Sequence, residues 1–277
     1  MLSDSVREIV ARALAEDIGA GDVTTVATVD ELGVARAEVV AKAEGVVAGL
    51  EVMGEVFLAV NPWVEFDAPP LDGVAVVPGD VVARIVGPAR ALLTAERTAL
   101  NFLQRMSGIA TLTARYVAAV KGTRVQILDT RKTAPGLRAL DKYAVRMGGG
   151  RNHRFGLFDG VLIKDNHIRA AGGLGEAVAA ARAQAHHLLR LEVEAQSLAQ
   201  VEQALQARAD VIMLDNLSLD EVRQAVAMIG DRAQTEVSGG ITLETVRAYA
   251  ECGVDFISVG ELTHSPRALD FSLEFAE

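Results

Sequence analysis

The chain has 277 residues, half of them hydrophobic, with a formal net charge of -10 and a single cysteine, Cys252. The length suffices for one large domain or two smaller ones, and the acidic charge argues against nucleic acid as the main partner. One cysteine excludes an internal disulfide, no apolar run reaches the roughly 18 residues of a membrane span, and the N-terminal segment lacks the apolar stretch of a signal peptide, so we expect a cytoplasmic protein.

The N-terminal part of the chain predicts an α+β domain. After an amphipathic first helix, residues 35–49 partly alternate in polarity, as a half-exposed strand does. Pro78–Asp80 is a turn between two valine-rich strands. Thr94 is a candidate N-cap for a helix that we expect to stop at Ser107–Gly108, with a second helix from there to about Gly122.

Beyond this part, apolar runs alternate with helix signals. Ser197 followed by Gln200, and Ser218 followed by Glu221, match the capping box that begins a helix. The last four runs begin about twenty to twenty-five residues apart, which is the spacing of βα units. The pattern predicts a β/α barrel with a modified start, whose strands are residues 125–129, 160–163, 188–193, 209–214, 233–237 and 254–259.

The last residues have strand character again. Phe271, Leu273 and Phe275 share one face of a strand, which would most simply return to the N-terminal sheet. We therefore predict an N-terminal domain of residues 1–107 joined by strand 267–277, and a barrel domain of residues 108–266.

Each predicted barrel strand turns polar where it ends. The six ends read DTRK, KDNH, EVEA, LDN, SGG and VGE. In a β/α barrel the carboxyl ends of the strands share one face, where the loops build the active site. These side chains therefore predict a common pocket.

The residues at these ends favour an anionic ligand. Ser238–Gly240 and Gly260 follow the last two strands, where backbone N–H groups and a helix N-terminus would bind phosphate. Glu194 and Asp215 suit Mg²⁺, ribose hydroxyls or a developing cation, and Glu192, of the same strand parity, should lie deeper. Eleven Lys or Arg between Lys121 and Arg169 face only four Asp, which indicates either an anion site or solvated helix faces.

The segment around residues 148–168 leaves two chemistries open. Arginine forks such as that of Arg154 bind carboxylates, whereas Lys164 could instead act as a Schiff-base nucleophile. The histidines lack the HxxxH or HExxH spacing of a transition-metal site.

Seven segments in order resemble the quinolinate phosphoribosyltransferase family, also called carboxylating nicotinate-nucleotide pyrophosphorylase. They are AERTALNFLQRMSGIATLT, ILDTRKTAPGLRALDKYAVRMGGGRNHRFGL, VLIKDNHI, EVE, MLDN, SGGIT and ISVGELTHS. The resemblance implies an enzyme that joins quinolinate to phosphoribosyl pyrophosphate with Mg²⁺, releases pyrophosphate and CO2, and serves de novo NAD synthesis. It also implies an N-terminal α/β sandwich, an incomplete seven-stranded barrel, and a homodimer with shared sites or a hexamer of dimers.

The resemblance also implies a role for each site residue. Arg131, His153 and Arg154 would hold the two quinolinate carboxylates. Lys132 and Lys164 would add positive charge near the carboxylates and the pyrophosphate. Glu194 and Asp215 would face the ribose and its Mg²⁺. The 5′-phosphate would be bound by Ser238, Gly239, Gly240 and Gly260. Arg97 would reach into the site from the neighbouring subunit.

Three other functions remain open at this point. A relative associated with molybdenum uptake would keep the phosphoribosyl site and change the acceptor. A Schiff-base aldolase would use Lys164, and a non-catalytic protein would bind quinolinate without releasing pyrophosphate. The intact TRK, NHR and KDNH segments favour the phosphoribosyltransferase.

Overall fold

The computed structural model describes residues 2–276, so Met1 and Glu277, the outer ends of the predicted N-terminal domain and its returning strand, lie outside the described residues. The chain forms two compact units. The first contains the described residues up to 114, together with 133–149 and those from 262 onward, and the second contains 115–132 and 150–261. Residues 133–149 thus cluster with the first unit, although they fall within the predicted barrel range.

The first unit is built on a four-stranded antiparallel sheet of order β12-β1-β5-β3. The C-terminal strand pairs with β1 through register partners such as Val39 and Leu273, as the alternation of its side chains predicted. A separate pair, β2 and β4, completes the strands of this unit. The strands are β1 (Val34–Ala41), β2 (Gly45–Val46), β3 (Glu65–Asp67), β4 (Ala75–Val76), β5 (Val81–Pro88) and β12 (Phe271–Phe275).

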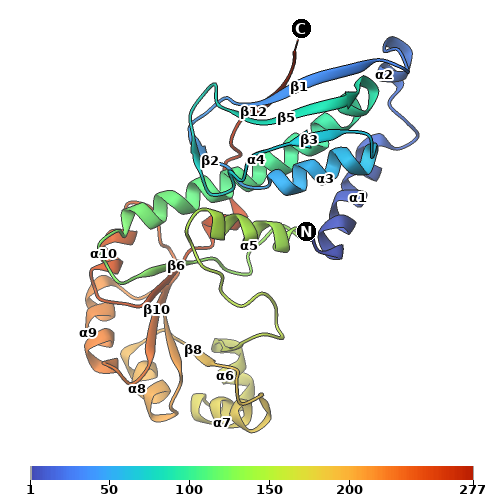
Figure 1. Cartoon of the computed structure of the whole chain (residues 1–277). Coiled ribbons are helices and arrows are strands. Elements are labelled where there is room, and N and C mark those ends of the chain that lie inside the picture. Colours follow the sequence, from blue (N-terminus) through green and yellow to red (C-terminus); the bar gives the residue numbers. More distant parts are fainter. Residues whose placement is uncertain (1, 277) are drawn as a thin grey trace. The chain divides into compact units, whose positions relative to one another are not determined.

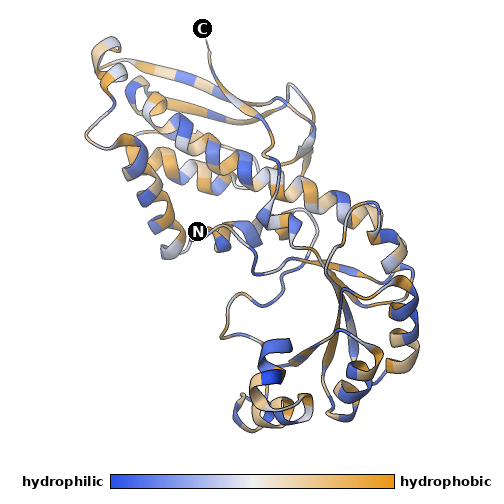
Figure 2. Cartoon of the chain, turned by 180° about the vertical axis from the view of Figure 1, so that it is seen from behind, coloured by the Kyte–Doolittle hydropathy of each residue, from blue (hydrophilic) through white to orange (hydrophobic). Residues whose placement is uncertain are grey.

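Helices lie beside the sheet of this unit (Figure 1). Met53 and Phe57 of α3 are fully buried, and the Phe57 ring stacks on Phe66 of β3 at 6.2 Å between centroids. In Figure 2 these helices carry both hydrophilic and hydrophobic residues, as expected when one face is covered and the other meets water. The helices are α1 (Asp4–Ile18), α2 (Val23–Thr28), α3 (Leu50–Val60), α4 (Ala89–Ala119), α5 (Arg138–Met147) and α11 (Glu261–His264).

The structure contradicts the two helices predicted on either side of Ser107–Gly108. One helix, α4, runs without a break for 31 residues, and Thr94 lies inside it, where its hydroxyl donates to Asp22 Oδ2. Gly108 is needed for close approach, because a Cβ there would lie 2.2 Å from the carbonyl oxygen of Arg267. Ser107 Oγ accepts from the backbone N–H of Ala48 at 3.0 Å. Both residues therefore serve tertiary packing, which local sequence does not reveal.

A buried ion pair explains why residues 133–149 belong to the first unit. Arg105 on α4 donates from Nε and Nη2 to the two oxygens of Asp141 on α5, at 3.0 and 2.9 Å. Asp141 is fully buried and also accepts from the backbone N–H of Ala134. Such a two-pronged arginine–carboxylate pair fixes orientation as well as distance.

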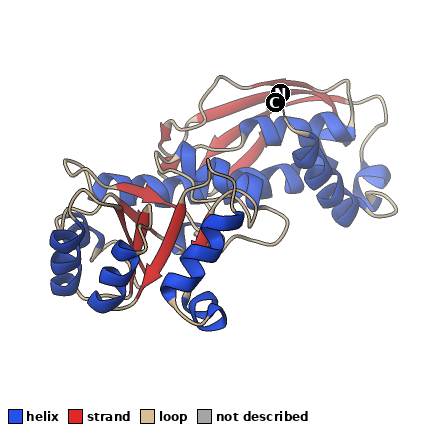
Figure 3. Ribbon diagram, turned by 90° about the horizontal axis from the view of Figure 1, so that it is seen from below, coloured by secondary structure: helices blue, strands red, loops and turns tan. Residues whose placement is uncertain are grey.

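The second unit is a parallel six-stranded sheet with helices against it (Figures 1 and 3). All six predicted strands are present, in the order β6-β11-β10-β9-β8-β7. A parallel bridge between Leu128 and Arg151 adds one more segment beside β6, so the expected seventh strand is reduced to a single bridge. The strands are β6 (Gln126–Leu128), β7 (Val161–Ile163), β8 (Leu191–Ala195), β9 (Val211–Asp215), β10 (Gln234–Ser238) and β11 (Phe256–Ser258).

Two helices of the second unit begin where the capping signals place them. Ser218 and Glu221 form the predicted capping box of α9, and Ser197 caps α8 by accepting from the backbone N–H of Gln200. No helix among residues 2–276 has both the length and the apolar character of a membrane span. The helices are α6 (Asp165–Ala171), α7 (Leu174–Gln184), α8 (Leu198–Gln206), α9 (Leu219–Ile229) and α10 (Val246–Ala250).

Candidate functional site

Four predicted site residues stand at the carboxyl ends of neighbouring strands in the second unit. Lys164 follows β7, Glu194 lies in β8, and Asp215 of β9 pairs in register with Ser238 of β10. Lys164 Nζ lies 2.6 Å from Glu194 Oε2, an ion pair in which the carboxylate is buried and the lysine is 45 % exposed. The parallel strands thus bring together charges that are far apart in the sequence.

Two amide side chains that the sequence analysis did not single out support the carboxylates. Gln196 Nε2 reaches Glu194 Oε1 at 3.4 Å and Asp215 Oδ2 at 3.2 Å. Asn216 Nδ2 donates to Asp215 Oδ2 at 2.9 Å from a left-handed backbone with φ of 56°. The available signal was their position directly after the strand-end acids, and strained conformations of this kind cluster at functional sites.

Asp129 positions the loop that carries the NHR segment. Its carboxylate is fully buried and accepts from Asn152 Nδ2 at 2.6 Å and from the backbone N–H of His153 at 2.8 Å. The backbone N–H of Asp129 donates to the carbonyl of Arg151, so the loop is tied to the end of β6. Of the charges in DTRK, the first therefore has a structural role.

Arg131 and Arg154 form a pair of cationic groups. Burial lowers the pKa of the Arg154 guanidinium, and the positive charge of Arg131 lowers it further. Arg154 Nη1 donates to the carbonyl of Gly160 at 3.0 Å. Arg131 Nε is buried, and the described residues give it no hydrogen-bond partner. An anion with two carboxylates would relieve the repulsion and satisfy the buried donor.

His153 faces protein groups with both ring nitrogens. Nδ1 accepts from the backbone N–H of Arg154 at 2.7 Å, a network that assigns the ring hydrogen to Nε2. Nε2 lies 3.0 Å from Glu192 Oε2 and 3.7 Å from Glu236 Oε2. The structure therefore gives His153 a contact with two buried acids, which the sequence did not predict.

Glu192, Glu236 and His153 make up what we call the buried acid cluster. Glu192 lies two residues before Glu194 on β8 and is buried, as the shared parity predicted. Burial raises the pKa of Glu236 well above its usual value, and the negative charge of Glu192 raises it further, whereas Ser258 and Lys164 oppose the shift. Oε1 of each acid lacks a hydrogen-bond partner within the described chain. The raised pKa favours the protonated form of Glu236 in the folded protein.

Glu236 was not among the candidates that the sequence indicated. An acid in the middle of the apolar run TEVS was the available signal, because such a residue must find a partner when it is buried. One ligand atom from each member of the buried acid cluster lies within 4.8 Å of the others, close enough to hold a metal ion. Besides Glu194 and Asp215, the buried acid cluster is therefore a second group of residues that could bind a metal ion.

The glycine segment after β10 forms a tight turn. Gly239 and Gly240 have φ of 92° and 62°, the left-handed region that favours glycine. A Cβ on Gly239 would lie 2.2 Å from Asn216 Oδ1, so the turn packs directly against the residue that supports Asp215. The expected helix N-terminus is not adjacent, since α10 begins only at Val246. A phosphate here would depend on backbone N–H groups and the Ser238 hydroxyl.

Three further predicted residues are Lys132, Gly260 and Arg97. The Lys132 side chain is exposed, and its backbone N–H donates to Thr130 Oγ1. Gly260 lies between β11 and α11. Arg97 is exposed on α4 in the first unit and makes no hydrogen bond or ion pair with any described residue, including Glu96. The local ion pair expected of an ordinary surface arginine is therefore missing.

The basic segment between Lys121 and Arg169 does not form one site. Arg131, Arg154 and Lys164 belong to the second unit, whereas Arg138, Lys142 and Arg146 lie on α5 in the first. Charge counting alone could not make this division, because it ignores where the chain folds back.

Comparison with known families matches nearly the whole chain. Residues 22–107 match the model described as "Quinolinate phosphoribosyl transferase, N-terminal domain", and residues 109–274 match "Quinolinate phosphoribosyl transferase, C-terminal domain". A Bacillus subtilis protein named probable nicotinate-nucleotide pyrophosphorylase [carboxylating] is 48% identical over 94% of this chain and 89% of its own. The Mycobacterium leprae nicotinate-nucleotide pyrophosphorylase [carboxylating] is 46% identical over 98% of this chain and 97% of its own.

Solved structures have the same architecture. The protein titled NadC from Streptococcus pyogenes superposes with a TM-score of 0.94 at 44% identity, over 100% of this chain and 99% of its own.

Proposed function

The chain belongs to the quinolinate phosphoribosyltransferase family, and we propose that it transfers phosphoribose from phosphoribosyl pyrophosphate to quinolinate, giving nicotinate mononucleotide, pyrophosphate and CO2 in de novo NAD synthesis. The observation that carries this proposal is the pair formed by Arg131 and Arg154. Two neighbouring guanidinium groups, one with a buried donor that lacks a partner, match a pyridine dicarboxylate. His153 holds the backbone of Arg154 and so orients this pair.

Glu194 and Asp215 face the other substrate. As the bond from ribose to pyrophosphate lengthens, positive charge develops on the sugar, and the two carboxylates at the ends of β8 and β9 stabilise it. Lys164 offers its remaining donors to the quinolinate carboxylates or the departing pyrophosphate. The turn at Ser238–Gly240 and the residue Gly260 bind the 5′-phosphate through backbone N–H groups, with Lys132 as a further cation.

Asp215 is better suited than Glu194 to bind Mg²⁺ in this site. Both oxygens of Glu194 already have partners, Lys164 and Gln196, whereas Oδ1 of Asp215 accepts no hydrogen bond from the described residues. Asp215 would therefore hold the ion together with pyrophosphate oxygens, and Glu194 would act through its charge. When bound, Mg²⁺ supplies positive charge that neutralises the leaving pyrophosphate.

Loss of CO2 needs little further machinery from the protein. Once the ring nitrogen is bonded to ribose, the pyridinium ring accepts the electron pair left by the C2 carboxylate, and a proton then takes its place. Arg131 and Arg154 keep the ring in position while this occurs. A water-poor pocket would favour this loss of a buried charge.

The Schiff-base alternative has less support. A nucleophilic lysine needs a desolvated, unpaired amine, whereas Lys164 is 45 % exposed and paired with Glu194. Incubation with quinolinate, phosphoribosyl pyrophosphate and Mg²⁺ should yield nicotinate mononucleotide and pyrophosphate in equal amounts. Trapping of Lys164 by borohydride in the presence of a carbonyl substrate, without that product, would instead support an aldolase.

We also propose a homodimer, or an assembly of such dimers, in which Arg97 completes the partner's site. The support is that Arg97 is an exposed arginine with no ion partner among the described residues. Mixing inactive Arg97→Ala and Lys164→Ala chains tests this, because a mixed dimer would have one intact site. Random pairing makes about half the dimers mixed, so activity should return to roughly a quarter of wild type. No recovery despite demonstrated exchange would place Arg97 in its own subunit's site or outside it.

We further propose a cytoplasmic location, which is supported only by the single free thiol of Cys252. Cell fractionation would test it.

A further inference from the structure

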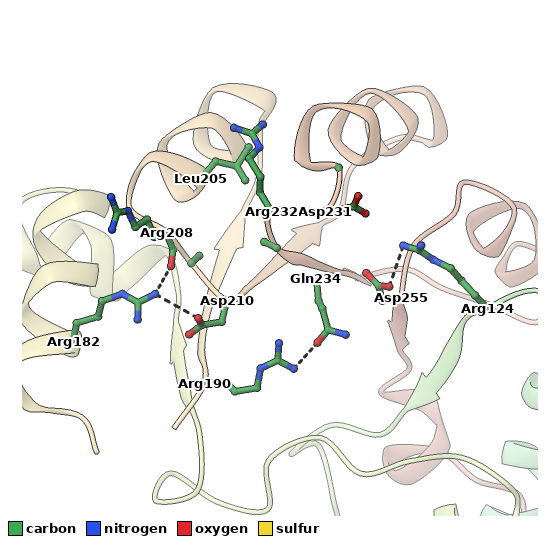
Figure 4. A pocket seen from close by; sticks show the side chains of 13 residues that line it. Arg124, Arg182, Arg190, Leu205, Arg208, Asp210, Asp231, Arg232, Gln234 and Asp255 are labelled. Carbon is green, nitrogen blue, oxygen red and sulfur yellow. Dashed lines mark hydrogen bonds and ion pairs between the residues drawn. The ribbon is translucent and has the colours of Figure 1, made fainter. Parts of the chain in front are cut away.

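The second unit has a large basic pocket at the amino ends of its strands, the end opposite to the candidate site (Figure 4). The cavity measures about 960 Å³. Arg190 and Asp210 directly precede β8 and β9, Gln234 begins β10, and Asp255 precedes β11. We call it the arginine pocket, after the five arginines in its lining: Arg124, Arg182, Arg190, Arg208 and Arg232.

Positive charge exceeds negative charge in this pocket. Five arginines face three acids, Asp210, Asp231 and Asp255, which leaves an excess of two positive charges in a chain whose net charge is -10. Arg124 pairs with Asp255 at 3.0 Å, and Arg182 lies 3.6 Å from Asp210. The other three arginines therefore share a single acid.

These three arginines donate few hydrogen bonds to other protein groups. Arg190 donates to the amide oxygen of Gln234, and Arg232 donates to the carbonyls of Ile229 and Met228. Those acceptors are neutral, and they use only part of the five N–H groups of each guanidinium. The Arg208 side chain makes no hydrogen bond or ion pair with any described residue, although its carbonyl accepts from Arg182.

The backbone at Arg208 provides a second, independent observation. The residue lies just beyond the C-cap of α8 with φ of 60°, in the left-handed conformation that glycine usually provides at a helix end. Among the described non-glycine residues, only Arg208 and Asn216 have positive φ, and Asn216 supports the candidate site. An arginine at such a position costs conformational energy, and strain of this kind is retained where a side chain serves a function.

We propose that the arginine pocket binds an oligophosphate anion, a chain of two or three phosphates. Such an anion carries several charges on closely spaced oxygens, which suits several arginine forks around one cavity. The lining has no aromatic side chain on which a nucleobase could stack, so the phosphate chain itself is the recognised group. The source could be inorganic or the phosphate tail of a nucleotide. The proposal goes beyond the transferase activity and does not depend on it.

Calorimetry with inorganic tripolyphosphate on the full chain, at constant ionic strength, tests the proposal. Arg190→Gln should weaken binding by roughly tenfold or more, as expected when a charge-assisted contact is lost. Arg223→Gln is the matched control, because Arg223 is an exposed arginine of the same unit that pairs with Asp220 outside the pocket. Equal weakening by both variants would mean nonspecific charge attraction and would overturn the site.

Arg208→Gly should raise the Tm of the anion-free protein and reduce the further rise in Tm that the anion causes. Without anion, Tm should rise, because glycine relieves the left-handed strain and one like charge leaves the pocket. With tripolyphosphate, the anion-induced rise in Tm should shrink relative to wild type. A variant that loses stability without anion, or keeps the full anion-induced rise, contradicts the assigned role of Arg208.

Two further arms locate the anion and its source. ATP and tripolyphosphate should both bind, and binding of ATP alone would show that the base is recognised and would refute the proposal. Because Lys164 is proposed to contact pyrophosphate in the candidate site, Lys164→Ala should weaken oligophosphate binding only there and should leave intact the binding that Arg190→Gln removes. Binding that is lost in Lys164→Ala and kept in Arg190→Gln would place the anion in the candidate site instead.

Discussion

Replacing Glu236 by glutamine should make the protein more stable, by an amount that grows with pH. Glu236 is 2% exposed on β10. The groups that face it are Glu192 on β8, His153 in the loop after β6, Lys164 after β7 and Ser258 on β11. Burial and the charge of Glu192 raise its pKa, so the folded protein holds a proton that the unfolded chain gives up. Glutamine has the shape of the protonated acid and does not titrate.

The size of the effect follows from proton linkage. Between the usual pKa of about 4.5 and the raised pKa in the folded state, the native protein binds one proton more than the unfolded chain. Stability of the wild type therefore falls as pH rises, by roughly 1 kcal/mol per pH unit for that one proton. For a chain of this size that corresponds to about 2–4 °C in Tm per pH unit. The difference stops growing above the folded-state pKa.

Thermal unfolding of both proteins from about pH 5 to pH 8 measures this difference. Glu221→Gln is a control in the same unit whose Tm difference from wild type should stay nearly constant over this range, because hydrogen bonds from Ser218 lower the pKa of Glu221. The stability that Glu221 contributes is present above its unfolded pKa and is lost as pH falls. A Tm difference between Glu236→Gln and wild type that stays constant with pH would mean that Glu236 is ionised in the folded protein, and the raised pKa assigned to it would be wrong.

Three shorter predictions concern the proposed reaction. If Arg131 and Arg154 bind two carboxylates, nicotinate should be a poorer acceptor by roughly 30-fold to several thousand-fold, the value of a charge-assisted pair in a desolvated site, and similar kcat/KM for both acceptors would refute it. Glu194→Gln or Asp215→Asn should lower kcat by about two to three decades, with calorimetric quinolinate affinity nearly unchanged. Gly239→Ala should raise KM for phosphoribosyl pyrophosphate more than KM for quinolinate, since an added Cβ meets a side-chain oxygen at 2.2 Å.

The strand-end residues could be predicted because their positions follow from a simple rule. Once the apolar runs are recognised as parallel strands, their carboxyl ends must share one face, and the contact of Lys164 with Glu194 follows from that geometry. Alternation along β8 likewise places Glu192 on the same face as Glu194, and both are buried. The periodicity of apolar residues along each strand is enough to predict these positions.

Other features depend on contacts between distant segments. The partnership of His153 with Glu236 joins a loop and a strand more than eighty residues apart in the printed sequence. Gly108 looks like a helix break until the segment at Arg267 is known to lie against it. The arginines of the basic segment divide between two units because the chain returns to the first after β6. Sequence order alone determines none of these.

The close contact at Gly108 has a consequence for assembly of the chain during synthesis. Residues 267–271 lie along α4, where the Leu269 N–H donates to the Gln104 carbonyl and Gln104 Nε2 donates to the Phe271 carbonyl. This docking leads into β12, which covers one side of β1. Since β12 follows the second unit in the chain, β1 remains an unpaired edge strand while the second unit is translated. During that interval the nascent chain exposes a surface to which other strands can add, so a side chain at position 108 would endanger yield more than catalysis.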